Sequence, residues 1–212
     1  LASSLNFNDF LIMPPAYYKY GDKEVIEFYS KIIETIPECK IILYNFEKLC
    51  GYKFSIICVE ELVKKFPEQI IGVKDSSYNL YENLKIENFS VFPGSELKLL
   101  KSLELGCEGI ITATCNVTAS ISRKVYDDFY KNEKQTANEM LCNVRRVFDQ
   151  FNLISGLHSF MSNENEIYKN VLPPISLLNK KDKKKLSEDL NKLNFQIETL
   201  RSTWNEFSKI FK

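Results

Sequence analysis

The feature that most constrains the fold is an alternation of short apolar runs with segments whose apolar residues recur every three or four positions. The apolar runs predict buried strands over residues 9–15, 40–46, 69–75, 89–94 and 108–114. The segments between them, such as the stripe of Val25, Phe28, Tyr29 and Ile32, predict helices. Apolar strands that alternate with helices are typical of a parallel sheet covered by helices. The order of elements leaves two architectures open: part of an eight-stranded barrel or an open sheet.

The second part of the chain follows a different pattern. From about residue 133 the strand-like runs stop and only helical stripes continue. The last stripe spaces its apolar residues alternately four and three apart, as in a heptad seam that packs on its own domain or on a sister subunit. It comprises Leu186, Leu190, Leu193, Ile197, Leu200, Trp204, Phe207 and Phe211. We therefore expect a partial βα barrel over residues 1–132 and a helical extension over 133–212.

Composition excludes several classes of function. Lysine plus arginine and aspartate plus glutamate both number 28, so the net charge is zero and no general nucleic-acid-binding surface is expected. No apolar run approaches the roughly 18–20 residues that span a bilayer. The only histidine is His158, and the six cysteines form no CxxC pair, which argues against a Cys/His zinc site and a histidine-based triad. His158 is interpreted as a core or interface residue, and a reducing cytoplasmic location is expected.

Chemically capable side chains gather where the predicted strands end, which is where active sites form in α/β folds. Lys74 directly follows an apolar run and has three interpretations: a surface residue with a buried stem, half of an ion pair with Asp75 or Glu96, or an amine used for chemistry. Burial disfavours the charged form of an amine, and a neutral lysine can attack a keto group to form a Schiff base. A nearby tyrosine could then move protons.

Four motifs carry a resemblance to a known family. The segments "YNF" (44–46), "GVKDSS" (72–77), "FPGSE" (92–96) and "GIITATCNV" (109–117), in this order and spacing, resemble the dihydrodipicolinate synthase / N-acetylneuraminate lyase family. The resemblance implies a (β/α)₈ barrel with a C-terminal helical extension. It also implies a lyase or synthase that binds pyruvate, or another 2-keto acid, as a Schiff base and joins it to an aldehyde or releases it from one.

The resemblance assigns expected roles to individual residues. Lys74 matches the Schiff-base lysine, and Tyr44 matches the tyrosine that relays protons and contacts the substrate carboxylate. Ile111 matches the residue whose backbone carbonyl faces the keto acid, with Gly94 and Ser95 in the neighbouring loop. No metal or organic cofactor is implied, because the lysine itself supplies the electron sink.

A tyrosine outside these motifs links the resemblance to assembly. Tyr18, within "PPAYYK", matches the tyrosine that family members insert into a neighbouring subunit's site. The resemblance therefore implies a homo-oligomer, a tetramer or a dimer. Family members also carry further βα units upstream, with a loop that holds the keto-acid carboxylate, and nothing in these residues corresponds to it. We accordingly expect a truncated barrel of about strands 4–8.

Leu49 departs from the family's lysine-pathway synthases, which have an arginine there for the carboxylate of the aldehyde. An apolar leucine cannot make that contact. The expected activity is like that of a 4-hydroxy-tetrahydrodipicolinate synthase. A sialate-lyase-like enzyme and a 2-keto-3-deoxy sugar acid aldolase are alternatives. A non-catalytic keto-acid-binding or scaffold protein is an alternative from another class.

Overall fold

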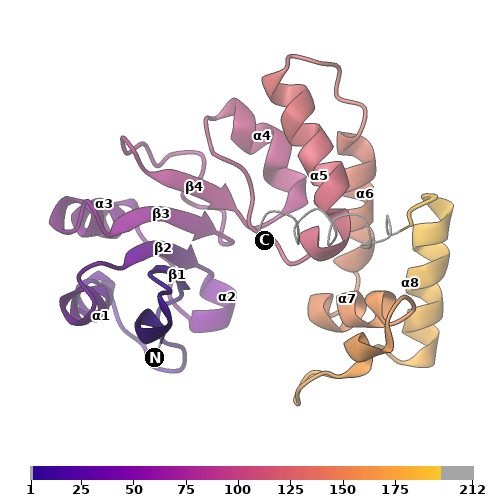
Figure 1. Ribbon diagram of the computed structural model, residues 1–212, viewed down its shortest axis with the longest axis horizontal. Coiled ribbons are helices and arrows are strands. Elements are labelled where there is room, and N and C mark those ends of the chain that lie inside the picture. The colour runs from indigo at the N-terminus through magenta and orange to yellow at the C-terminus, as the bar shows by residue number, and fades with distance from the viewer. Residues whose placement is uncertain (1, 197–212) are drawn as a thin grey trace. The chain divides into compact units, whose positions relative to one another are not determined.

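The computed structural model describes residues 2–196, and the chain divides into two compact units, Leu1–Thr112 and Ala113–Lys212 (Figure 1). Each unit has its own hydrophobic core. Helix α5 (Cys115–Tyr130) groups by its contacts with the helices that follow it. The division into domains at 1–132 and 133–212 stays a prediction.

The first unit is the α/β part of the chain. Its elements are η1 (Ser3–Leu5), β1 (Asp9–Ile12), α1 (Asp22–Thr35), β2 (Lys40–Asn45), α2 (Glu47–Cys50), α3 (Ile56–Lys65), β3 (Ile70–Asp75), β4 (Ser90–Pro93), η2 (Glu96–Lys98) and α4 (Leu99–Glu104). The predicted helix starts have local causes. The Ser55 hydroxyl accepts the Cys58 amide at 2.9 Å at the start of α3, and the Glu24 carboxylate accepts the Gly21 amide at 2.9 Å before α1.

The strands β1 to β4 form one parallel sheet in the order of the chain, β1-β2-β3-β4. A doubly wound sheet reverses its strand order at a switch point, whereas a βα barrel adds each strand beside the preceding one. The predicted α/β class with a parallel sheet is confirmed, and the sequential order is that of a barrel wall.

The two faces of this sheet differ in burial because side chains alternate along each strand. Ile41, Leu43 and Val73 are fully buried on one face. Helices α1 and α3 supply a large part of this core, including Val25, Tyr29, Val59 and Leu62. On the other face Ile42, Tyr44, Lys74 and Phe92 are only half-buried. One face is thus a packed core and the other remains accessible.

The predicted fifth strand, over residues 108–114, is wrong. This segment follows β4 without forming a strand, and its backbone contact with β4 is the Ile111 amide, which donates to the Pro93 carbonyl at 3.2 Å. The Glu108 side chain accepts the Val91 amide at 2.8 Å, the place where a strand carbonyl would bind. Gly109 has a φ of +149°, a value that L-residues rarely adopt, so regular pairing is not continued.

The second unit contains helices only, among the residues that the structure describes. They are α5 (Cys115–Tyr130), α6 (Asn138–Phe148), α7 (Leu153–Met161), η3 (Glu166–Lys169) and α8 (Lys180–Lys192). Val144, Phe148, Leu157, Leu186 and Leu190 build its core. The heptad seam is observed only as far as Leu193, and Ile197, Leu200, Trp204, Phe207 and Phe211 lie outside the described residues. Over residues 2–196, no helix has the length and apolarity needed to cross a membrane.

Candidate active site

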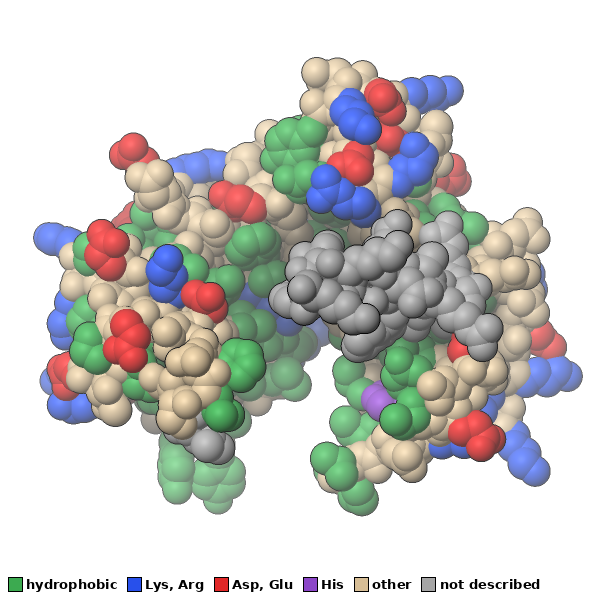
Figure 2. Space-filling model, viewed as in Figure 1, with side chains coloured by type: hydrophobic (Ala, Val, Ile, Leu, Met, Phe, Trp, Pro, Cys, Tyr) green, Lys and Arg blue, Asp and Glu red, His purple; other side chains and the backbone are tan. Residues whose placement is uncertain are grey.

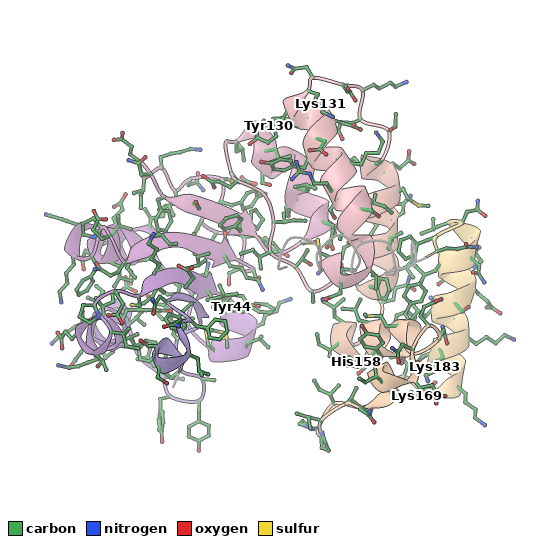
Figure 3. The ribbon with its side chains drawn as sticks, in the orientation of Figure 1. Tyr44, Tyr130, Lys131, His158, Lys169 and Lys183 are labelled. Atoms are coloured by element: carbon green, nitrogen blue, oxygen red, sulfur yellow. The ribbon has the colours of Figure 1, made fainter. Side chains whose placement is uncertain are left out.

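Lys74 and Tyr44 lie side by side at the carboxyl ends of two neighbouring strands. The register pairs Tyr44 of β2 with Lys74 of β3, and Lys74 with Phe92 of β4, so all three side chains share the accessible face. The Lys74 Nζ lies 4.0 Å from the centroid of the Tyr44 ring. Figure 3 shows Tyr44 at the end of its strand, beside α2. The sequence prediction that these two residues meet is therefore supported by the geometry.

The structure removes one of the three interpretations of Lys74. Within residues 2–196 its ammonium forms no ion pair, and its contact is the face of the Tyr44 ring. Asp75 points to the opposite face of the sheet, and the Glu96 carboxylate accepts the Thr112 hydroxyl at 3.1 Å. The ion-pair interpretation is therefore wrong. A half-buried amine held over an aromatic ring remains available to react.

Gly94, Ser95 and Ile111 border the β4 side of this face. The Gly94 amide donates to the Asp75 carbonyl at 3.0 Å, and a Cβ at Gly94 would lie 2.1 Å from the Ser76 Oγ. Only glycine therefore lets the loop after β4 pack against Ser76, the residue that follows β3. The buried Ser95 hydroxyl accepts the Leu97 amide at 3.3 Å and begins η2.

Tyr18 and Leu49 are not brought into contact with Lys74. Tyr18 lies on the loop after β1, is 73% exposed, and packs edge-on against Tyr17 with ring centroids 5.0 Å apart. Leu49 lies on α2, directly after the Tyr44 strand, and its side chain is 57% exposed. Both side chains are exposed, and the predicted roles of Tyr18 at a neighbouring subunit and of Leu49 at the second substrate stay predictions.

Sequence reasoning missed two neighbours of the Tyr44–Lys74 pair. Phe92 lies beside Lys74 in the register, and the Phe46 ring stacks on Tyr44 with centroids 6.0 Å apart. The sequence contains a signal for Phe92, because residues two positions apart along a strand share a face and Phe92 lies two positions before the predicted site residue Gly94. The hydrogen-bonded pair of Asn45 and Asp75, at 2.8 Å, was also missed. The sequence does contain a signal for this pair, because a polar residue directly follows both Tyr44 and Lys74.

The loop after Lys74 carries a tyrosine with altered ionisation. Burial, together with a hydrogen bond to the Glu82 carboxylate at 2.5 Å, raises the pKa of Tyr81 to about 12. Its hydroxyl therefore stays protonated at neutral pH and is not a base. No group of three or more histidine, cysteine or acidic residues gathers as a metal site anywhere in residues 2–196.

Two surface features involve none of the predicted site residues. On the face shown in Figure 2, acidic and basic side chains are interspersed instead of forming one large patch. A cavity of about 560 Å³ in the second unit is lined in part by Phe151, Asn152 and Lys185. No residue of the predicted site lines it.

Comparison with known proteins decides the family. The profile of the Dihydrodipicolinate synthetase family matches residues 2–193. The chain belongs to this family. The resemblance found in the four sequence motifs is thereby confirmed over nearly the whole chain.

The curated relatives of this chain are named as different enzymes. An N-acetylneuraminate lyase of Clostridium perfringens is 28% identical over 142 residues, which cover 65% of this chain and 48% of the lyase. A 2-dehydro-3-deoxy-D-gluconate/2-dehydro-3-deoxy-phosphogluconate aldolase of Picrophilus torridus is 25% identical over 78% of this chain and 64% of the aldolase. A 4-hydroxy-tetrahydrodipicolinate synthase of Acaryochloris marina is 24% identical over 66% of this chain and 48% of the synthase. The chain spans about half the length of the curated relatives it matches.

Solved structures support the fold of the family member. The dihydrodipicolinate synthase of Cyanidioschyzon merolae, solved with lysine bound, has a TM-score of 0.83 at 14% identity and covers 92% of this chain, which in turn covers 68% of it. YagE, a prophage protein of the same family from Escherichia coli solved with pyruvate, has a TM-score of 0.76 at 20% identity, with coverages of 92% and 69%. At these identities the likeness concerns the fold alone.

Proposed function

We propose that Lys74 forms a Schiff base with pyruvate or another 2-keto acid, in a lyase or synthase that breaks or makes a carbon–carbon bond to an aldehyde. The observation that carries this proposal is the Lys74 Nζ, which lies 4.0 Å over the Tyr44 ring on the accessible sheet face and forms no ion pair within residues 2–196. Family membership supports the same class of reaction.

The chemistry follows from the amine. The neutral Nζ attacks the C2 carbonyl carbon, a carbon–nitrogen bond forms, and the carbonyl oxygen leaves as water to give an iminium. The iminium draws electrons from C3, so a C3 proton is released and an enamine forms. In the synthetic direction the enamine carbon attacks the aldehyde and the aldehyde oxygen takes a proton. In the cleavage direction the carbon–carbon bond breaks by the reverse of this attack, and in both directions water finally hydrolyses the iminium and releases the keto acid from Lys74.

Tyr44 is the proposed proton carrier, because its ring already contacts the amine that reacts. Its hydroxyl and the loop of Gly94, Ser95 and Ile111 are proposed to hold the keto acid. The four-stranded sheet is proposed to be part of a barrel wall. Tyr18, 73% exposed, is proposed to reach a neighbouring subunit of a cytoplasmic homo-oligomer.

Leu49 bears on the second substrate. Its exposed apolar side chain follows the Tyr44 strand, and within α2 it offers no charge for a carboxylate. This favours an uncharged, sugar-derived aldehyde, as for the sialate lyase and sugar-acid aldolase relatives, over the aspartate semialdehyde of a 4-hydroxy-tetrahydrodipicolinate synthase. Lys48, the cationic residue directly before Leu49, would have to bind the carboxylate in place of the missing arginine.

The test uses pyruvate alone and needs no knowledge of the aldehyde. In D₂O, enamine formation replaces the C3 protons of pyruvate with deuterium, which proton NMR follows as a loss of the methyl signal. We expect protein-dependent exchange that disappears in Lys74→Ala and persists in Lys40→Ala. Lys40 is an exposed lysine at the start of β2, at the end of that strand away from Tyr44.

Two results would contradict the proposal. Equal exchange by the Lys74→Ala variant would mean that another group performs the chemistry. Pyruvate binding by calorimetry without any exchange, on protein folded by circular dichroism, would identify a non-catalytic keto-acid-binding protein instead.

A further inference from the structure

We propose that Asn45 and Asp75 form a clamp that positions Tyr44 and Lys74, an inference that rests on the function proposed for Lys74. Asn45 is the last residue of β2 and Asp75 is the last residue of β3, and the two are paired in the register. Each therefore directly follows one member of the reactive pair, on the opposite face of the sheet. Both side chains are 0% exposed.

The Asp75 carboxylate organises the loop that follows Lys74. It accepts the backbone amides of Tyr78 at 2.9 Å, Leu80 at 2.8 Å and Tyr81 at 3.0 Å, and the Asn45 Nδ2 at 2.8 Å. A buried carboxylate without such donors would be strongly destabilising. All four donors are neutral, so the loop itself has to fold around the carboxylate.

The Asn45 side chain connects this loop to the segment between α2 and α3. Its Nδ2 donates to Asp75 and, at 2.9 Å, to the Asn79 Oδ1, while its Oδ1 accepts the Phe54 amide at 3.1 Å. The Asn79 Nδ2 closes the ring by donating to the Phe54 carbonyl at 2.9 Å. Both ends of the Asn45 amide are thus used, each on a different loop.

This arrangement couples the two strand ends. A shift of β2 against β3 would move the Tyr44 ring relative to the Lys74 Nζ, and it would also break the Asn45–Asp75 hydrogen bond. Displacements of about 1 Å at reacting groups can lower rates about 100-fold. Asn45 and Asp75 are therefore positioning residues, because their side chains lie on the face of the sheet opposite to the Lys74 and Tyr44 side chains.

The first experiment compares Asn45→Ala with Asn83→Ala, an exposed asparagine outside this network. The measurements are amide hydrogen exchange over residues 76–81 and competitive acetylation of Lys74 relative to Lys40. We expect Asn45→Ala to exchange these amides about tenfold faster and to change the relative labelling of Lys74 at least about threefold. Asn83→Ala should match the wild type. Unchanged exchange and labelling in a folded Asn45→Ala protein would overturn the proposal.

A second variant separates positioning from general stability. In Asn45→Asp two carboxylates face each other, and a proton shared between them at low pH restores the lost donor. Burial, with a smaller contribution from Asp75, raises the pKa of Tyr81 to about 12 and the pKa of Cys107 to about 11, so neither group titrates between pH 5 and 8. We expect the relative Lys74 labelling of the variant to approach the wild-type value towards pH 5. A pH-independent difference would contradict the clamp.

The two proposals fail in different ways. Absence of pyruvate exchange by the wild type would reject the Schiff-base function. Lysine labelling and amide exchange require no pyruvate, so they still decide whether Asn45 and Asp75 set the reactivity of Lys74.

Discussion

The two faces of the sheet are built from the same strands and have opposite properties. Leu43 and Val73 are fully buried beneath helices, whereas Tyr44 and Lys74, one position further along each strand, lie on the accessible face. Alternation along a strand lets neighbouring residues serve different ends. The packed face admits polar side chains only where they are hydrogen-bonded, as Asn45 and Asp75 are, whereas the accessible face can carry the lysine and the tyrosine.

The strongest test of this division replaces the reactive residue. Lys74→Met keeps the length of the side chain and removes the amine, so pyruvate exchange should fall by about 1,000-fold or more. Because Lys74 is half-buried and forms no ion pair within residues 2–196, the free energy of unfolding should change by less than about 1 kcal/mol. Urea denaturation checks this, and a large loss of stability would contradict the division.

The converse test removes matched apolar side chains from the two faces of β2. Leu43→Ala deletes a fully buried side chain and should lower the free energy of unfolding by about 3 kcal/mol. Ile42→Ala, on the accessible face, should cost about 1 kcal/mol. Denaturant titration of the two variants measures both values, and equal losses would mean that the faces are packed alike.

A subtler change separates the Tyr44 ring from its hydroxyl. Tyr44→Phe keeps the ring beneath the Lys74 Nζ, so adduct formation should persist. Exchange of the pyruvate C3 protons should fall about 100-fold, because the proton carrier is gone. NMR in D₂O gives the rate. Wild-type exchange by the variant would reassign the proton transfer to another group.

The smallest effect concerns the thiols of the first unit. Burial raises the pKa of Cys58 and of Cys107 to about 11, from an ordinary value of 9.0. The unfolded chain releases these protons first as pH rises, so their contribution to stability is present below pH 9 and is lost between about pH 9 and 11. The urea midpoint should decline modestly over that range. Cys58→Ala should reduce the slope of the decline, and an unchanged slope would contradict the assignment to Cys58.

Sequence reasoning captured what depends on local pattern. The runs that end in Tyr44 and Lys74 are strands, and the Val25 stripe is a helix, because burial of one periodic face determines both. The strand predicted around Ile111 failed because the Glu108 side chain takes the place of a backbone partner of β4 and Gly109 adopts a φ of +149°. The apolar residues of this segment give no indication that a side chain will take the place of a backbone hydrogen-bond partner.

The supporting network of the site was not predictable in the same way. The hydrogen bond between Asn45 and Asp75 spans 30 positions of sequence and depends on a register that no local pattern sets. The isolation of Lys74 from Asp75 also follows from register and alternation. The ion-pair interpretation relied on nearness in sequence for Asp75 and on a shared edge of the predicted sheet for Glu96.

The central claim is that Lys74 is the amine that reacts with a keto acid. The most direct measurement incubates the protein with pyruvate and sodium borohydride and locates the added mass on every lysine by peptide mapping. The account predicts a reduced pyruvyl adduct at Lys74 and little at exposed lysines such as Lys40 and Lys85. No adduct on folded protein, or an adduct spread evenly over the lysines, would contradict it.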